Sequence, residues 1–168
     1  AKGDALTRLG KNDEALKMYT RARSLGYAPP DGQAQIARAL MRKERWAEAL
    51  KELQPLAAVR PSAEVFLLIG ECYQGLKQNV SALEAFRQAV KLDNRSAAAY
   101  FRQGQVMYDE REYQAAAESL ERALALDQAG NGFDRARARK MANEALRKAG
   151  GGHKKPAEGA SATSLLPQ

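Results

Sequence analysis

The chain repeats itself at an interval of about 34 residues, and this interval limits its fold more than any other feature. A small residue recurs at steps of 34, 33 and 34 residues. A large residue follows it four positions later, and another apolar residue follows three positions after that. The three columns are Ala15, Ala49, Ala82 and Ala116; Tyr19, Leu53, Phe86 and Leu120; and Ala22, Leu56, Ala89 and Ala123. A period in this range is typical of a stacked repeat architecture.

The spacing inside each repeat predicts helices. Steps of four and seven residues place the columns on one face of a helix. A fourth column lies twelve positions before the first, at Gly3, Ala37, Gly70 and Gly104. We interpret its small residues as points where two helices cross closely, with a bulky residue of the partner helix filling the space. Polar turns at 10–13, 42–45, 77–79 and 109–112 are short enough to force antiparallel neighbours.

These residues resemble the tetratricopeptide-repeat (TPR) family. The segments 70–73 and 82–93 are close to the family consensus, and 104–127 repeats the same pattern. The resemblance covers about residues 1–128. It implies an all-α fold, a right-handed α-solenoid of antiparallel helix pairs that forms a TPR superhelix.

The repeat also divides the chain. We predict a TPR array over 1–149, made of a partial repeat at 1–29, repeats at 30–62, 63–96 and 97–130, and a capping helix at 133–149. A final helix with a polar outer side commonly closes such arrays. Residues 150–168 are small, polar and contain proline, so we expect a disordered tail. Because the chain opens inside a repeat, we interpret it as cut from a longer chain; a natural terminus that frays is the alternative.

The charge is concentrated at one end. The net charge is +7, yet residues 129–168 hold eight Lys or Arg and three Asp or Glu, which leaves only +2 for the rest. A nucleic-acid-binding face would spread cations along a groove with aromatic residues between them. We therefore expect no nucleic-acid partner, and keep binding through the basic end as a lower-ranked alternative.

Residues that carry chemistry are scarce. The only histidine, His153, lies in the expected tail, and the only cysteine, Cys72, lies on a helix face between apolar residues. A nucleophile needs a neighbouring base and a metal needs several convergent ligands. The glycines at 150–152 lack the strand and helix that flank a phosphate-binding loop. We expect no catalytic residue, no metal site and no cofactor, and interpret Cys72 as a buried core residue.

Targeting signals are also lacking. No apolar run reaches the 18 residues that would indicate a membrane span, and no signal-peptide pattern opens the sequence. We expect a cytoplasmic location; a periplasmic or membrane-anchored parent chain stays open because the N-terminus looks truncated. The abundance of Ala and Arg suggests a bacterial source.

The family resemblance implies a partner site in the concave groove, which is lined by the first helix of each pair. Carried over by alignment, the lining residues are Ala34, Arg38, Met41 and Arg42; Glu64, Leu67, Glu71, Gln74 and Gly75; and Ala98, Phe101, Gln105, Tyr108 and Asp109. The end helix adds Arg135 and Arg139, four residues apart. The residues that we predict to bind the partner are Arg38, Met41, Arg42, Leu67, Glu71, Gln74, Phe101, Gln105, Tyr108, Asp109, Arg135 and Arg139.

Two aromatic residues are the sharpest indication within that set. Phe101 and Tyr108 are seven residues apart and share a helix face that does not hold Gly104. An exposed aromatic pair would be a good anchor for a partner. The alternative, weighted equally, is that each ring packs against a neighbouring helix.

The arginine pairs suggest the chemistry of a ligand. Arg38 with Arg42, and Arg135 with Arg139, would suit an acidic peptide, although surface cations are usually only solvated. Some TPR domains hold the acidic tails of chaperones in a two-carboxylate clamp. That clamp is not matched here, because its slots hold Ala34, Arg38, Leu67 and Glu71.

The leading hypothesis is a non-enzymatic protein–protein interaction module, a scaffold or adaptor that binds a partner protein or peptide in its groove. The alternative is a regulatory TPR domain of a larger signalling or modifying enzyme, which contacts its own chain or recruits its substrate. Self-association through the ends of the array is a third possibility.

Overall fold

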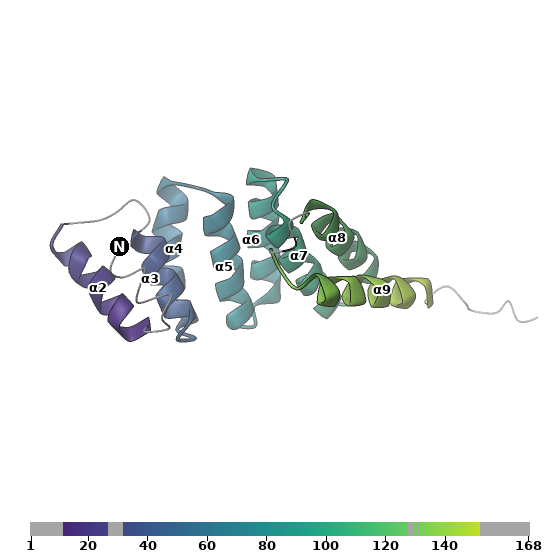
Figure 1. Ribbon diagram of the computed structural model, residues 1–168, viewed down its shortest axis with the longest axis horizontal. Coiled ribbons are helices and arrows are strands. Elements are labelled where there is room, and N and C mark those ends of the chain that lie inside the picture. The colour runs from purple at the N-terminus through teal and green to yellow at the C-terminus, as the bar shows by residue number, and fades with distance from the viewer. Residues whose placement is uncertain (1–11, 27–31, 128–129, 131, 152–168) are drawn as a thin grey trace, which may run out of the picture.

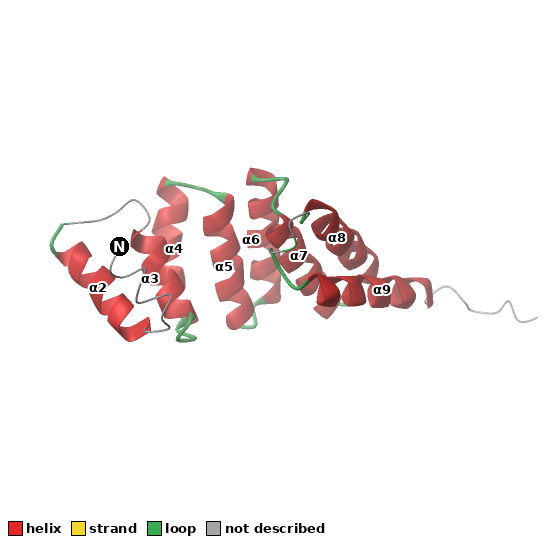
Figure 2. Ribbon diagram, in the orientation of Figure 1, coloured by secondary structure: helices red, strands yellow, loops and turns green. Residues whose placement is uncertain are grey.

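The computed structural model describes residues 12–26, 32–127, 130 and 132–151. Within these ranges the chain forms eight α-helices and no strand (Figure 2). The helices are α2 (Asn12–Ser24), α3 (Gly32–Met41), α4 (Trp46–Val59), α5 (Ala63–Gly75), α6 (Asn79–Leu92), α7 (Ala97–Asp109), α8 (Tyr113–Leu126) and α9 (Arg135–Gly151).

The helices stand in a row in the order of the chain (Figure 1). The principal contacts join consecutive helices, and the pairs α3–α4, α5–α6 and α7–α8 fall inside the three repeats predicted as complete. Packing of each element mainly on its sequence neighbours is characteristic of a solenoid. The predicted all-α architecture is therefore confirmed.

The repeating columns form the core. The four alanines of the first column are all 0% exposed, at Ala15, Ala49, Ala82 and Ala116. In the bulky column Leu53, Phe86 and Leu120 are also 0% exposed, while Tyr19 is half-buried. The face predicted from the repeat is thus the buried face of α4, α6 and α8.

Two glycines allow the helices of a pair to approach closely. A Cβ atom placed on Gly70 would lie 2.3 Å from Cε1 of Phe86, and one on Gly104 would lie 2.7 Å from Cγ of Leu120. Neither side chain has room to coexist with an added methyl group. The predicted pairing of a small residue with a bulky one is confirmed at both crossings.

The turn inside each pair has a shared backbone conformation. Glu44, Lys77 and Arg111 have φ of 57°, 60° and 65°, the left-handed region. In each turn the next backbone N–H donates to a carbonyl five residues earlier, in the bonds Arg45 to Leu40, Gln78 to Tyr73 and Glu112 to Met107. This is the Schellman ending of a helix, and it reverses the chain within a few residues. The repetition explains why all three pairs have the same antiparallel geometry.

The first helix of a pair is capped where the sequence places a serine directly before it. Ser62 accepts a hydrogen bond from the Val65 N–H at 3.2 Å, and Ser96 accepts one from the Ala99 N–H at 3.3 Å. A side-chain oxygen at this position satisfies one of the free N–H groups of the first turn. The caps fix where α5 and α7 begin.

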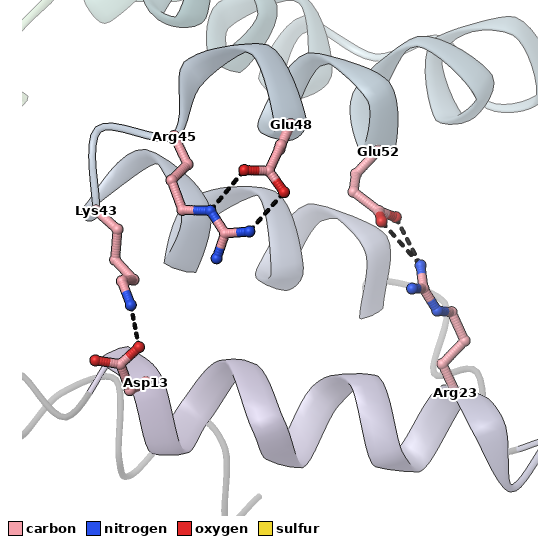
Figure 3. Close-up of polar contacts among 6 residues, drawn as sticks. All are labelled: Asp13, Arg23, Lys43, Arg45, Glu48 and Glu52. Carbon is pink, nitrogen blue, oxygen red and sulfur yellow. Dashed lines mark hydrogen bonds and ion pairs between the residues drawn. The ribbon is translucent and has the colours of Figure 1, made fainter.

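Helix α2 is held against the α3–α4 pair by its buried face and by ion pairs at its two ends (Figure 3). Asp13 pairs with Lys43, and Arg23 pairs with Glu52 at 2.8 Å. The hydrogen bond from Lys43 lowers the pKa of Asp13. Exposed pairs contribute little stability, so the buried Ala15 contributes more to holding α2.

Helix α9 closes the described array by packing on α8. Its inner side buries Ala138, Ala142 and Ala145. The helix continues to Gly151, two residues beyond the end predicted at residue 149. Glycine lowers helix propensity by about 1 kcal/mol but does not forbid helix. The tail predicted as disordered lies outside the described residues, apart from Gly150 and Gly151.

Candidate partner-binding groove

A groove of about 590 Å³ runs across the first helices of successive pairs. We call it the inner groove. Its lining comes from α3, α5, α7 and α9, with one residue from α4 and one from the turn after α3. The lining residues are Arg38, Met41, Arg42, Trp46, Leu68, Glu71, Gln74, Gly75, Arg102, Gln105, Asp109 and Arg137.

The only tryptophan of the chain forms an apolar wall of this groove. Trp46 is the first residue of α4 and is half-buried. Its indole lies directly over Gly75, where a Cβ atom would be 2.3 Å from the ring carbon Cδ2. Met41, also half-buried, packs against the same core. The groove therefore offers apolar surface at the ends of α3 and α5.

Ion pairs between successive first helices occupy several charged groups of the groove. Arg38 on α3 pairs with Glu64 on α5 at 2.5 Å, and Arg102 on α7 pairs with Glu71 on α5 at 2.7 Å. Arg102 also donates a hydrogen bond of 3.3 Å to the amide oxygen of Gln105. Each pair ties one repeat to the next and neutralises a charge.

Three charged side chains of the lining have no ion-pair partner within the described part of the chain. They are Arg42 after α3, Asp109 at the end of α7, and Arg137 on α9. All three residues are exposed. These are the charged groups of the inner groove that remain free to meet a ligand.

The structure brings seven of the twelve predicted partner-binding residues into the lining. They are Arg38, Met41, Arg42, Glu71, Gln74, Gln105 and Asp109. Gln105 is only 8% exposed, so it contributes to the floor. The other five residues, Leu67, Phe101, Tyr108, Arg135 and Arg139, do not line the groove.

Phe101 is not an exposed anchor. It is 6% exposed and its ring stacks on Phe133, with centroids 4.4 Å apart and an angle of 7° between the rings. Phe133 belongs to the segment that leads into α9, so the closing helix covers this side of α7. The interpretation of Phe101 as packing against a neighbouring element is the one that the structure supports. Leu67, one repeat earlier, is half-buried against a core cluster formed mainly by residues of α6, α7 and α8.

Tyr108 also contacts α9. Its hydroxyl accepts a hydrogen bond of 2.8 Å from Lys148, and its ring meets Tyr113 edge-on at 5.6 Å. The Lys148 ammonium lies over both rings, at 4.7 and 5.1 Å from their centroids. The hydrogen bonds to Tyr108 and Glu144 raise the pKa of Lys148. Hydrogen bonds with Tyr108 and Lys148 lower the pKa of Glu144. Tyr108 therefore helps to dock the end helix.

Arg135, predicted with Arg139 to meet a ligand, contacts the end of α8. Its guanidinium donates to the carbonyl of Leu124 at 3.1 Å and to that of Asp127, and lies 3.6 Å from the buried Asp127 carboxylate. Free carbonyls at the end of a helix attract such a cation. Arg135 thus caps α8. Arg139 is exposed and outside the groove lining.

Sequence reasoning missed Trp46, Leu68, Arg102 and Arg137. On α5 and on α7 the lining includes the residue next to a predicted one. Leu68 and Arg102 line the groove, whereas Leu67 packs against the core and Phe101 stacks on Phe133. One residue is about 100° around a helix. Trp46 lies on a second helix, where no lining residue was expected. A lone tryptophan directly after a basic turn is the signal that could have indicated it.

The described residues contain no group of three or more His, Cys, Asp or Glu side chains able to hold a metal ion. Cys72 is 0% exposed, and burial, followed by the nearby Glu71 carboxylate, raises the pKa of its thiol to about 12.

None of the described helices is long and apolar enough to cross a membrane.

Comparisons with solved structures show the same fold. MamA from Desulfovibrio magneticus RS-1, from residue 41 to its end, is 23% identical with a TM-score of 0.69, and the match covers 77% of this chain and 73% of that one. The Sgt2 TPR domain from Aspergillus fumigatus is 21% identical, with a TM-score of 0.64 and coverages of 80% and 90%. The Yersinia enterocolitica type III secretion chaperone SycD, in complex with a peptide of the translocator YopD, is 19% identical, with a TM-score of 0.66 and coverages of 71% and 93%.

Sequence comparison gives the family. No curated protein matches the chain. The family model of the tetratricopeptide repeat matches residues 34–94 and 78–132, which together span more than half of the chain. With the paired helices and the repeating core, this match shows that the chain belongs to the tetratricopeptide-repeat family and has its α-solenoid fold.

Proposed function

We propose that this chain is a non-enzymatic protein–protein interaction module, a scaffold or adaptor that holds a segment of a partner protein in the inner groove. The observation that carries the proposal is the groove itself, which crosses the first helices of successive pairs. Its volume of about 590 Å³ is within the usual range of ligand sites. SycD, which shares the fold, has been solved with a peptide of another protein.

The composition of the groove suits a peptide better than a small metabolite. The large apolar side chains of the lining are Met41, Trp46 and Leu68, and eight of the twelve lining residues are polar or charged. A peptide places an apolar side chain and several polar groups along such a surface. Buried aromatic anchors surrounded by polar residues are the usual source of binding energy in protein interfaces.

A substitution that fills the groove tests this function. Gln74 is half-buried and lines the groove on α5, so Gln74→Trp would place an indole in the path of a ligand. Gln114→Trp, on the exposed side of α8, is the matched control. Random peptides displayed on phage are selected on the wild-type protein, and the enriched peptides are synthesised. Their affinity for the three proteins is measured by fluorescence anisotropy, after circular dichroism shows equal helicity.

The proposal expects the selected peptides to lose at least tenfold in affinity for Gln74→Trp and to bind Gln114→Trp as they bind the wild type. Loss of about 1.4 kcal/mol of binding free energy corresponds to that factor. Equal binding to all three proteins would place the peptide site outside the inner groove and contradict the proposal.

A further inference from the structure

Resting on the proposed function, we propose that the inner groove recognises an acidic segment of its partner: Arg42 and Arg137 hold carboxylates, and an apolar side chain of the same segment packs on Trp46. The ligand is thereby assigned a negative charge, and the closing helix a binding residue. The charges of the groove that lack a partner, and their positions, carry this assignment.

The internal ion pairs leave a positive excess. Arg38 with Glu64, and Arg102 with Glu71, neutralise each other across successive first helices. The free charges of the lining are then two arginines and one aspartate, namely Arg42, Arg137 and Asp109. A concave surface with an excess of one sign concentrates ligands of the opposite sign.

The closing helix strengthens this field. Helix α9 carries six Lys or Arg and one Glu, and it places Arg137 in the groove lining. Arg135, two residues earlier, caps α8 instead. Helix α9, which that cap holds on α8, therefore supplies the positive side chain of Arg137 to the groove. It does so from the other end of the row of helices than α3.

The two free arginines suit carboxylates. A guanidinium forms two parallel hydrogen bonds with a carboxylate, and such charge-assisted pairs are stronger than neutral hydrogen bonds. Arg42 comes from the turn after α3 and Arg137 from α9, and we assign both to one extended segment of the ligand. Trp46, four residues after Arg42, offers an apolar contact in the same lining.

The remaining acid of the groove favours a peptide over a polyanion. Asp109 belongs to the same lining and has no ion-pair partner within the described part of the chain, so its carboxylate would repel a continuous row of phosphates. An acidic peptide can place a neutral residue beside Asp109. The groove thus selects for separated acidic residues with an apolar residue near them.

The test compares charges on both sides of the interface. Peptides selected from the random phage library on the wild-type protein are synthesised, each with a partner in which every Asp or Glu is replaced by Asn or Gln. Both versions are titrated against the wild type, the double variant Arg42→Gln/Arg137→Gln, and the control Arg87→Gln/Arg122→Gln. The control removes two exposed cations from α6 and α8, outside the groove. Gln74→Trp and Gln114→Trp are measured in parallel.

The proposal expects acidic residues to be enriched among the peptides. Neutral versions should bind the wild type at least tenfold more weakly, since hydrogen bonds between charged groups are stronger than those to neutral groups. Arg42→Gln/Arg137→Gln should bind the acidic peptide at least tenfold more weakly than the wild type does. This variant should bind the acidic and neutral versions of the peptide with similar affinity. The control Arg87→Gln/Arg122→Gln should bind both versions as the wild type does. Added salt should lower the affinity of the acidic version more than that of the neutral version.

Two results overturn the proposal in different ways. Peptides that are blocked by Gln74→Trp but bind equally well in acidic and neutral form would end the charge assignment and leave the groove function standing. A failure to select any peptide, or peptides indifferent to Gln74→Trp, would remove the groove function and the charge assignment together.

Discussion

At the scale of single residues, the distance between paired helices is set by glycines facing large side chains. Gly70 lies under Phe86, and Gly104 lies under Leu120. Both large residues are 0% exposed, so they have no open side toward which to move. Dense packing of this kind makes even one added methyl group costly.

Gly70→Ala tests this packing. Alanine raises helix propensity by about 1 kcal/mol, but overpacking a full core costs about 1–3 kcal/mol, and the new Cβ would be 2.3 Å from the Phe86 ring. We expect a net destabilisation of about 1–2 kcal/mol in urea denaturation. Gly150→Ala is the control, because nothing lies within 4 Å of its Cβ position; it should be neutral or slightly stabilising. Equal effects of the two substitutions would contradict the account.

Cys72 gives a second residue-scale prediction, on reactivity and pH. The thiolate is the reactive form, and burial raises the pKa of this thiol from 9.0 to about 12. The folded protein should therefore resist a disulfide reagent at about pH 8 and react fully once denatured in urea. Above the unfolded pKa the unfolded chain releases this proton first, so the contribution of Cys72 to stability falls as pH rises from 9.0 toward about 12. Rapid reaction of the folded protein would show that the thiol is accessible.

The residues of the repeat were predictable, whereas the exact lining of the groove was not. Period and residue size are enough to identify Ala49, Leu53, Gly70 and Phe86 as core positions, because the same contact recurs in each repeat. Groove lining depends on the rotation of each first helix against the next repeat. That rotation is settled by contacts from distant segments, such as the stacking of Phe133 on Phe101.

At the scale of elements, α9 is fixed by three separate contacts. Phe133 stacks on Phe101 before the helix begins, Arg135 binds the end of α8, and Lys148 lies over Tyr108. The sequence predicted a closing helix from its apolar stripe. It could not show that the first arginine of the helix caps α8, since that contact depends on the path of the loop between them.

Arg135→Ala tests the role of this cap. The substitution removes the donor to the Leu124 carbonyl and leaves the buried Asp127 carboxylate without its cation. Hydrogen bonds to charged groups contribute about 1.5–3 kcal/mol, and we expect a loss of about 2 kcal/mol with faster amide exchange in α9. Arg139→Ala, an exposed position on the same helix, should change stability by less than about 0.5 kcal/mol. A loss from Arg139→Ala as large as that from Arg135→Ala would refute the cap.

At the scale of the whole molecule, the groove results from the repetition of one helix pair. Each pair adds one first helix to the lining, and each ion pair between first helices, such as Arg102 with Glu71, ties that helix to the one before it. Seven of the twelve predicted residues reach the lining because the repeat itself assigns the first helices to this surface. Trp46 and Arg137 also line the groove, although neither lies on the first helix of a pair. Their presence in the lining depends on the positions of the turn after α3 and of α9.

The measurement that tests the central claim most directly is backbone amide NMR mapping of the wild-type protein with a selected peptide. The account predicts that the largest chemical-shift changes fall on residues of α3, α5 and α7 in the inner groove, on Trp46, including its indole N–H, and on Arg137. Shifts confined to the outer sides of α4, α6 and α8, with the groove residues unchanged, would contradict it.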